Sequence, residues 1–300
     1  MEIWVLFTVV AALTQTFRSA GQKRLKSVLG DFGASYIRFS YALPFALVWL
    51  VLWMMMTAQP LPQTNMTFWF WVSLGGGAQV IFTVMLITLF SHRNFAAGTA
   101  FSKTEVLQAA LFEALIIGDI VSIQTGSAIL LGVIAIIMLS AHQSGASLSL
   151  ITRSLLSYQT VLGIGSGAFL GLSTVCFRAA TSSLETGDIV LRASMAAASS
   201  TMLQTLVMGL VMAIWARHQL VLTLTHWRQA WPVGLFGAIT TACWFIAFSL
   251  ATVASVRAIG QVELLITLLF TGSVFKERIS KTEYMAIGLL ILSIILVLLD

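Results

Sequence analysis

Ten predominantly apolar stretches follow one another along this 300-residue chain, joined by short polar links. A helix of about 20 apolar residues is long enough to cross a hydrocarbon core of about 30 Å. Because no stretch is left over for a soluble domain, we expect an all-α polytopic membrane protein. The expected transmembrane helices are 2–21, 34–57, 67–90, 96–117, 123–140, 158–178, 189–215, 229–250, 257–275 and 283–299.

Composition supports this class. Hydrophobic residues make up 58% of the chain and charged residues only 9%, whereas soluble domains carry about 25% charge. The net charge of +5 lies mostly in the links, where it can face an anionic lipid leaflet. Membrane lipid is therefore an expected partner and nucleic acid is not. Cys176 and Cys243 fall inside predicted helices and imply no disulfide framework.

The two halves of the chain resemble each other. A shift of 160 residues aligns Arg18 with Arg178, and a shift of 154 aligns Arg38 with Arg192. A shift of 158 aligns Glu105 with Glu263. Charged matches inside apolar helices are not expected from composition alone. We therefore predict two five-helix repeats, residues 1–142 and 143–300.

Charge placement indicates that the second repeat is inverted. The odd-numbered links hold ten of the 16 basic residues, and the even-numbered links hold none. By the positive-inside rule the odd links are cytoplasmic, which places both termini on the non-cytoplasmic side. The ten residues are Lys23, Arg24, Lys26, Arg93, Arg153, Arg217, Arg228, Lys276, Arg278 and Lys281.

Each half ends its first helix with a Phe-Arg-x-Ala pattern, at 17–20 and 177–180, and follows its fourth helix with an acid, Asp119 or Glu277. With ten helices in inverted halves, this pattern resembles the drug/metabolite transporter superfamily, and within it the EamA-type members. Lys276 stands where the family's Gly-Glu-Arg-like turn usually has glycine. The resemblance implies transport of amino acids, other metabolites or drugs. It also implies cytoplasmic termini, contrary to the link charges.

Six basic residues lie within the predicted helices, where charge at mid-bilayer costs about 2.5 to 3.5 kcal/mol on insertion scales. All but Lys103 lie near a helix end, where a long side chain can extend its charge to the membrane interface. For these residues, snorkelling or structural pairing is therefore an alternative to substrate contact. The repeat match favours Arg38 and Arg192 as substrate contacts. The five residues near helix ends are Arg18, Arg38, Arg178, Arg192 and Arg257.

Lys103, Glu105 and Glu263 fall deeper in their helices. Since the two glutamates hold equivalent places, an in-plane pseudo-two-fold axis predicts that they approach each other near the midplane. Desolvation and a like neighbour both raise a carboxyl's affinity for protons, which allows a proton-responsive site. Alternatively, an arginine of the same bundle neutralises each glutamate. Glu113 and Glu283, nearer helix ends, are expected at the membrane interface.

These charges suit a zwitterionic substrate. Its ammonium group meets a glutamate and its carboxylate meets Lys103 or Arg38, whereas a purely cationic drug leaves Lys103 unpaired. Aromatic residues wall such a pocket in this prediction. The predicted substrate-binding residues are Glu105, Glu263, Lys103, Arg38, Arg192, Tyr41 and Trp244.

Gly163, Gly167 and Gly171 recur at four-residue spacing in the helix 158–178. Small residues at this spacing let another helix backbone approach closely. We therefore predict a helix-packing face here. Gly165-Ser166-Gly167 is not expected to be catalytic, because the four histidines lie in or beside links and supply no base.

The sequence predicts a secondary transporter that exports an amino acid or related zwitterion by alternating access around a midplane cavity between the repeats. Proton coupling stays open. The alternatives are multidrug or cation efflux by proton antiport and a non-transporting assembly or sensor protein. No metal-ligand spacing or nucleotide-binding loop occurs, so we expect no metal, cofactor or ATPase. The expected location is a bacterial inner membrane, as a monomer or homodimer.

Overall fold

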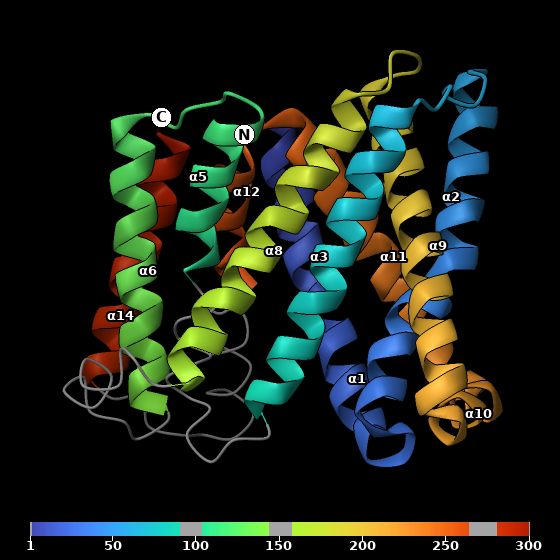
Figure 1. Ribbon diagram of the computed structural model, residues 1–300. Helices are drawn as coiled ribbons and strands as arrows, with labels where there is room; N and C mark the ends of the chain where they lie inside the picture. Colours follow the sequence, from blue (N-terminus) through green and yellow to red (C-terminus); the bar gives the residue numbers. More distant parts are fainter. Residues whose placement is uncertain (1, 91–103, 144–157, 264–280, 300) are drawn as a thin grey trace. The chain divides into compact units, whose positions relative to one another are not determined.

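The computed structural model describes residues 2–90, 104–143, 158–263 and 281–299. Every regular element in these ranges is a helix, as predicted (Figure 1). The helices are α1 (Ile3–Ser40), α2 (Ala42–Thr57), α3 (Met66–Phe90), α5 (Glu105–Ile116), α6 (Ile123–Gln143), α8 (Tyr158–Ser182), α9 (Ile189–Trp215), α10 (Arg217–Thr225), α11 (Trp227–Leu250), α12 (Val253–Gly260) and α14 (Lys281–Leu298).

Length and apolar composition allow five segments of the described ranges to cross a membrane, and two shorter helical segments are also apolar. The shorter segments are Ile123–Met138 and Tyr284–Leu298. Parts of the predicted helices 96–117 and 257–275 fall outside the described residues. The count of ten transmembrane helices and the repeat boundary after residue 142 therefore stay predictions.

The link predicted at residues 22–33 is helical. It belongs to α1, which changes direction at Gly30 (φ 74°, ψ 178°) and runs on to Ser40. This backbone conformation is essentially restricted to glycine, and a Cβ at Gly30 would also lie 2.6 Å from the side-chain amide carbon of Gln219. Gln22 Nε2, before the bend, donates to the Ala34 carbonyl beyond it at 2.8 Å. The predicted helix 34–57 is thus the end of α1 and all of α2, separated at Tyr41.

Residues 1–80 and 176–251 form one compact unit, here called unit 1. In it α1 packs on α11, and α2 lies beside α9 (Figure 1). One apolar cluster of this unit includes Phe68 of α3, Phe177 of α8 and Phe245 of α11, and the rings of Phe177 and Phe245 stack at 4.7 Å. Gly75 of α3 faces Phe177 so closely that a Cβ there would lie 2.8 Å from the ring.

Residues 81–175 and 252–300 form the second compact unit, unit 2. Here α6 packs along α14, and α5 packs on α12. The Ser293 hydroxyl of α14 donates to the Ala128 carbonyl of α6 at 2.7 Å. Each unit therefore combines segments from the first and the second half of the chain.

Asp188 explains why α9 begins at the predicted residue. Its carboxylate caps the helix by accepting from the Leu191 N–H at 2.8 Å, and it also accepts from the Gln59 amide at 2.7 Å and the Trp53 indole at 3.1 Å. Partial burial alone would raise the pKa of Asp188, but these bonds and one from the Val190 N–H outweigh burial and lower the pKa. The link after α2 is thus tied to the start of α9.

Candidate functional site

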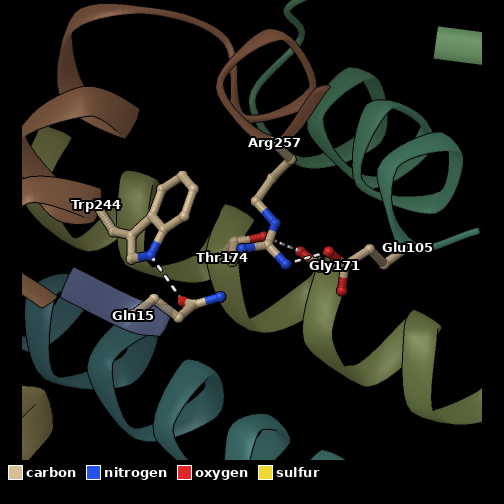
Figure 2. Close-up of polar contacts among 6 residues, drawn as sticks. All are labelled: Gln15, Glu105, Gly171, Thr174, Trp244 and Arg257. Atoms are coloured by element: carbon tan, nitrogen blue, oxygen red, sulfur yellow. Dashed lines mark hydrogen bonds and ion pairs between the residues drawn. The ribbon is translucent and has the colours of Figure 1, made fainter. Parts of the chain in front are cut away.

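Glu105 of α5 and Arg257 of α12 form an ion pair in unit 2 (Figure 2). Their side chains are only 8% and 14% exposed. Charges removed from water in this way need a close partner, because their desolvation is otherwise uncompensated. α12 begins at Val253, earlier than the predicted start at 257, so Arg257 sits inside a helix that packs on α5. The sequence analysis placed Arg257 near a helix end and left open snorkelling or structural pairing on one side and substrate contact on the other.

Glu113 holds the start of α12. One carboxylate oxygen accepts the Val253 N–H at 2.8 Å and the other accepts the Ala254 N–H at 3.3 Å. Backbone N–H groups at a helix N-terminus lack helical partners and attract negative charge. Glu113 is 0% exposed, so protein encloses this carboxylate. Its expected depth near the membrane interface stays a prediction.

The positions of Glu105 and Glu113 follow from the pattern of α5. Glu105, Ala109 and Glu113 recur every four residues and are all buried, so they form one face of the helix. The small Ala109 between the acids lets a neighbouring backbone approach. This spacing of two acids around an alanine was the signal in the sequence that could have identified Glu113.

α8 packs closely on α5 beside Glu105, and Gly171 is the point of contact. A Cβ at Gly171 would lie 3.1 Å from the backbone oxygen of Glu105 and 3.1 Å from the backbone nitrogen of Ala109. The Thr174 hydroxyl donates to the Gly171 carbonyl at 2.8 Å (Figure 2). Gly163 and Gly167 on the same helix are buried as well. Close backbone packing of α8 on α5 therefore fixes the main chain that carries Glu105.

Two other predicted residues belong to this part of the chain. Glu263 is partly buried and lies in helical backbone after α12, at the end of a described range within unit 2. Lys103 lies outside the described residues. The predicted approach of Glu105 to Glu263 and the role of Lys103 stay predictions.

The remaining predicted site residues lie in unit 1. The Arg38 guanidinium sits 4.7 Å from the centre of the Phe39 ring. The Trp244 indole donates to Gln15 Oε1 at 3.0 Å (Figure 2). Arg192 donates to the Leu184 carbonyl, just after α8, at 3.1 Å, which is a structural contact.

Tyr41 also makes structural contacts in unit 1. Its hydroxyl donates to the Thr223 carbonyl at 2.8 Å, which ties the break between α1 and α2 to α10. Its backbone lies where a Cβ on Gly234 of α11 would collide with it. Tyr41 therefore fixes the place where the chain passes from α1 to α2.

No three His, Cys, Asp or Glu side chains gather as a metal site within the described ranges. The described part of unit 2 contains a buried carboxylate bonded to a guanidinium that is mostly, but not fully, buried. Such a pair can exchange partners with a ligand that carries both charges.

Comparison with known proteins identifies a family and a similar fold. Residues 158–299 match the EamA-like transporter family. No curated protein matches the chain. A solved structure titled "Crystal structure of protein" is similar at a TM-score of 0.72 and 12% identity, covering 99% of this chain and 96% of its own. That likeness concerns the fold alone. The resemblance inferred from the repeat motifs is therefore confirmed, and residues 158–299 of this multi-pass membrane protein match the EamA-like transporter family.

Proposed function

We propose that the protein is a secondary transporter that exports a small polar metabolite, an amino acid or related zwitterion, by alternating access. The observation that carries the proposal is the buried Glu105–Arg257 pair in a protein of a transporter family. A zwitterion can take the place of both partners: its ammonium group binds Glu105 in place of Arg257, and its carboxylate binds Arg257 in place of Glu105. No buried charge is then left uncompensated, which a low-dielectric site would penalise heavily.

The packing partners support alternating access by inverted repeats. The repeat alignment makes α2 equivalent to α9 and α6 equivalent to α14, and both of these pairs are in contact. An in-plane pseudo-two-fold axis relates such pairs in transporters built from inverted repeats. The ion pair also joins the two repeats, since Glu105 comes from the first and Arg257 from the second.

Transport by the full-length protein in proteoliposomes tests the proposal. A panel of zwitterionic amino acids, organic cations and organic anions is offered to the parent, to Glu105→Gln and to Arg257→Gln. We expect zwitterion transport to fall at least about tenfold in both variants, since each removes a charge that the substrate needs. Glu185→Gln and Arg228→Gln, which alter exposed charges, serve as matched controls.

The panel also separates the alternatives. Transport of organic cations that survives Arg257→Gln but not Glu105→Gln would favour cation efflux over zwitterion export. A requirement for a pH gradient that disappears with Glu105→Gln would indicate proton coupling through this carboxylate. Parent-like transport of every substrate by both variants would remove the pair from the mechanism.

A further inference from the structure

Two basic stretches that lie far apart in the sequence meet at one end of unit 1. Lys23, Arg24 and Lys26 precede the bend of α1 at Gly30, and Arg217 is the first residue of α10. All four basic side chains are exposed. α10 packs against α1 beside this bend (Figure 1). The contact between the two helices therefore gathers basic charge that the sequence distributes over two separate links.

Specific contacts hold α10 on the bend. The Gly33 N–H, just after the bend, donates to Gln219 Oε1 of α10 at 3.1 Å. Leu222 of α10 packs against an apolar cluster that includes the buried Leu25 and Leu29 of α1. Because Leu25 is directed inward, its two basic neighbours in the sequence carry their charges on the outside of this contact. The two basic stretches are thus parts of one fixed surface.

The face of α10 that turns away from α1 is apolar and exposed. Leu224 is 64% exposed, and Val221 and Arg217 share its face of the helix. Trp215, just before α10, is 79% exposed. The nine residues of α10 extend about 14 Å, which is too short to cross a hydrocarbon core of about 30 Å. A helix with exposed apolar and cationic side chains together suits the boundary between lipid headgroups and acyl chains.

The charge at this end of unit 1 is positive. Residues 21–33 and 215–225 contain four Lys and Arg residues and one acid, Asp31, which pairs with Lys26 at 2.9 Å. The other three basic side chains have no acidic partner within the ranges that the structure describes. Arginine presents paired N–H donors that match phosphate oxygens. The surface therefore favours an anionic phosphate group over a neutral or cationic headgroup.

We propose that this surface binds the headgroup of an anionic phospholipid, with its phosphate between the basic residues of the α1 bend and Arg217. Trp215 and Leu224 then lie where the headgroup meets the acyl chains. General attraction of basic links to an anionic leaflet needs no fixed site, whereas the docking of α10 on α1 builds one from two links. The α10 surface, as we call it, consists of Lys23, Arg24, Lys26, Trp215, Arg217 and Leu224.

Thermal unfolding of the purified full chain in nanodiscs tests this site without any transport substrate, so the result is independent of the proposed function. Phosphatidylglycerol replaces phosphatidylcholine stepwise, and soluble glycerol phosphate is added separately to discs of phosphatidylcholine alone. We expect phosphatidylglycerol to raise the unfolding temperature in a saturable way, and this rise to shrink at high salt. No rise with phosphatidylglycerol, or an equal rise with soluble glycerol phosphate, overturns the proposal.

Variants then locate the binding. Arg24→Gln and Arg217→Gln alter the two different links, and each should raise the half-saturating fraction of phosphatidylglycerol about fivefold, because each removes a cation at the leaflet surface.

Gln63→Glu is the matched control. It changes the net charge by the same one unit at an exposed position. The Gln63 N–H bonds Thr186, before the start of α9, whereas α10 follows the end of α9. Gln63→Glu should respond to phosphatidylglycerol like the parent. An unchanged half-saturating fraction in either arginine variant, or an equal change in Gln63→Glu, would contradict the assignment.

Discussion

The carboxylate of Glu113 lies 2.8 Å from the backbone nitrogen of Val253, the first residue of α12. These residues are 140 positions apart, and their bond joins the end of α5 to the start of α12. Arg257 follows Val253 by about one helical turn. Glu113 therefore helps to set the orientation of α12 and, with it, the direction in which Arg257 points toward Glu105.

Replacing Glu113 should loosen α12. Glu113→Ala removes a fully buried, charged acceptor, and we expect a loss of about 2 to 3 kcal/mol in the free energy of unfolding. Glu113→Gln keeps one acceptor oxygen and should lose less. Unfolding by denaturing detergent in mixed micelles measures both, and Glu185→Ala, an exposed acid, should stay within about 0.5 kcal/mol of the parent. Equal stability of Glu113→Ala and the parent would contradict the capping role.

The Glu105–Arg257 pair should show energetic coupling. Each single Gln substitution leaves the other charge buried, which costs up to about 3 to 5 kcal/mol. The double variant Glu105→Gln/Arg257→Gln removes both charges, so its loss should be smaller than the sum of the single losses. A double-mutant cycle on unfolding free energies measures the coupling, expected at about 1 to 3 kcal/mol. Additive losses would show that the pair contributes nothing as a pair.

Gly171 should not tolerate a side chain. Gly171→Ala places a methyl group 3.1 Å from backbone atoms of Glu105 and Ala109, which cannot rotate away. We expect a loss of about 1 to 3 kcal/mol through overpacking. Gly126→Ala in α6 is the matched control, because no atom lies within 4 Å of its added Cβ. That control should keep or gain up to about 1 kcal/mol, and the same outcome for Gly171→Ala would refute the close packing of α8 on α5.

The capping bonds of Asp188 make stability depend on pH. The folded-state pKa of Asp188 is lowered from 3.8, so its stabilisation is fully present above that value. It is lost as pH falls through the folded pKa. We expect Asp188→Asn to be less stable than the parent near neutral pH, with the difference shrinking below about pH 4. Thermal unfolding between pH 3 and pH 7 measures this difference, and a constant difference across the range would be inconsistent with it.

Helix positions were predictable where a local signal marks the boundary. The predicted helix 189–215 coincides with α9, because Asp188 is a capping residue and Ile189 opens an apolar run. At residues 22–33 the composition is polar, yet α1 continues through this stretch and bends at Gly30. α10 was read as a link, because nine mixed residues carry no transmembrane signal. α10 packs against α1, and this tertiary contact stabilises a helix that its composition does not predict.

The sequence predicted which charged residues belong to the candidate site, but not which of them pair with each other. The sequence identified Glu105 as a charge that needs a partner, and it kept neutralisation by an arginine as an alternative. It could not select Arg257, which is 152 residues away and lies near the start of its helix.

Because each unit combines segments from both halves of the chain, some helices enter the membrane long before their packing partners are synthesised. α6 packs on α14, which begins 138 residues after α6 ends. α2 is likewise synthesised well before its packing partner α9. At ribosomal speeds of about 5 to 20 residues per second, α6 spends on the order of ten seconds in the bilayer before its partner is made. During that interval lipid, the insertion machinery or another nascent copy must cover the face that α14 will occupy.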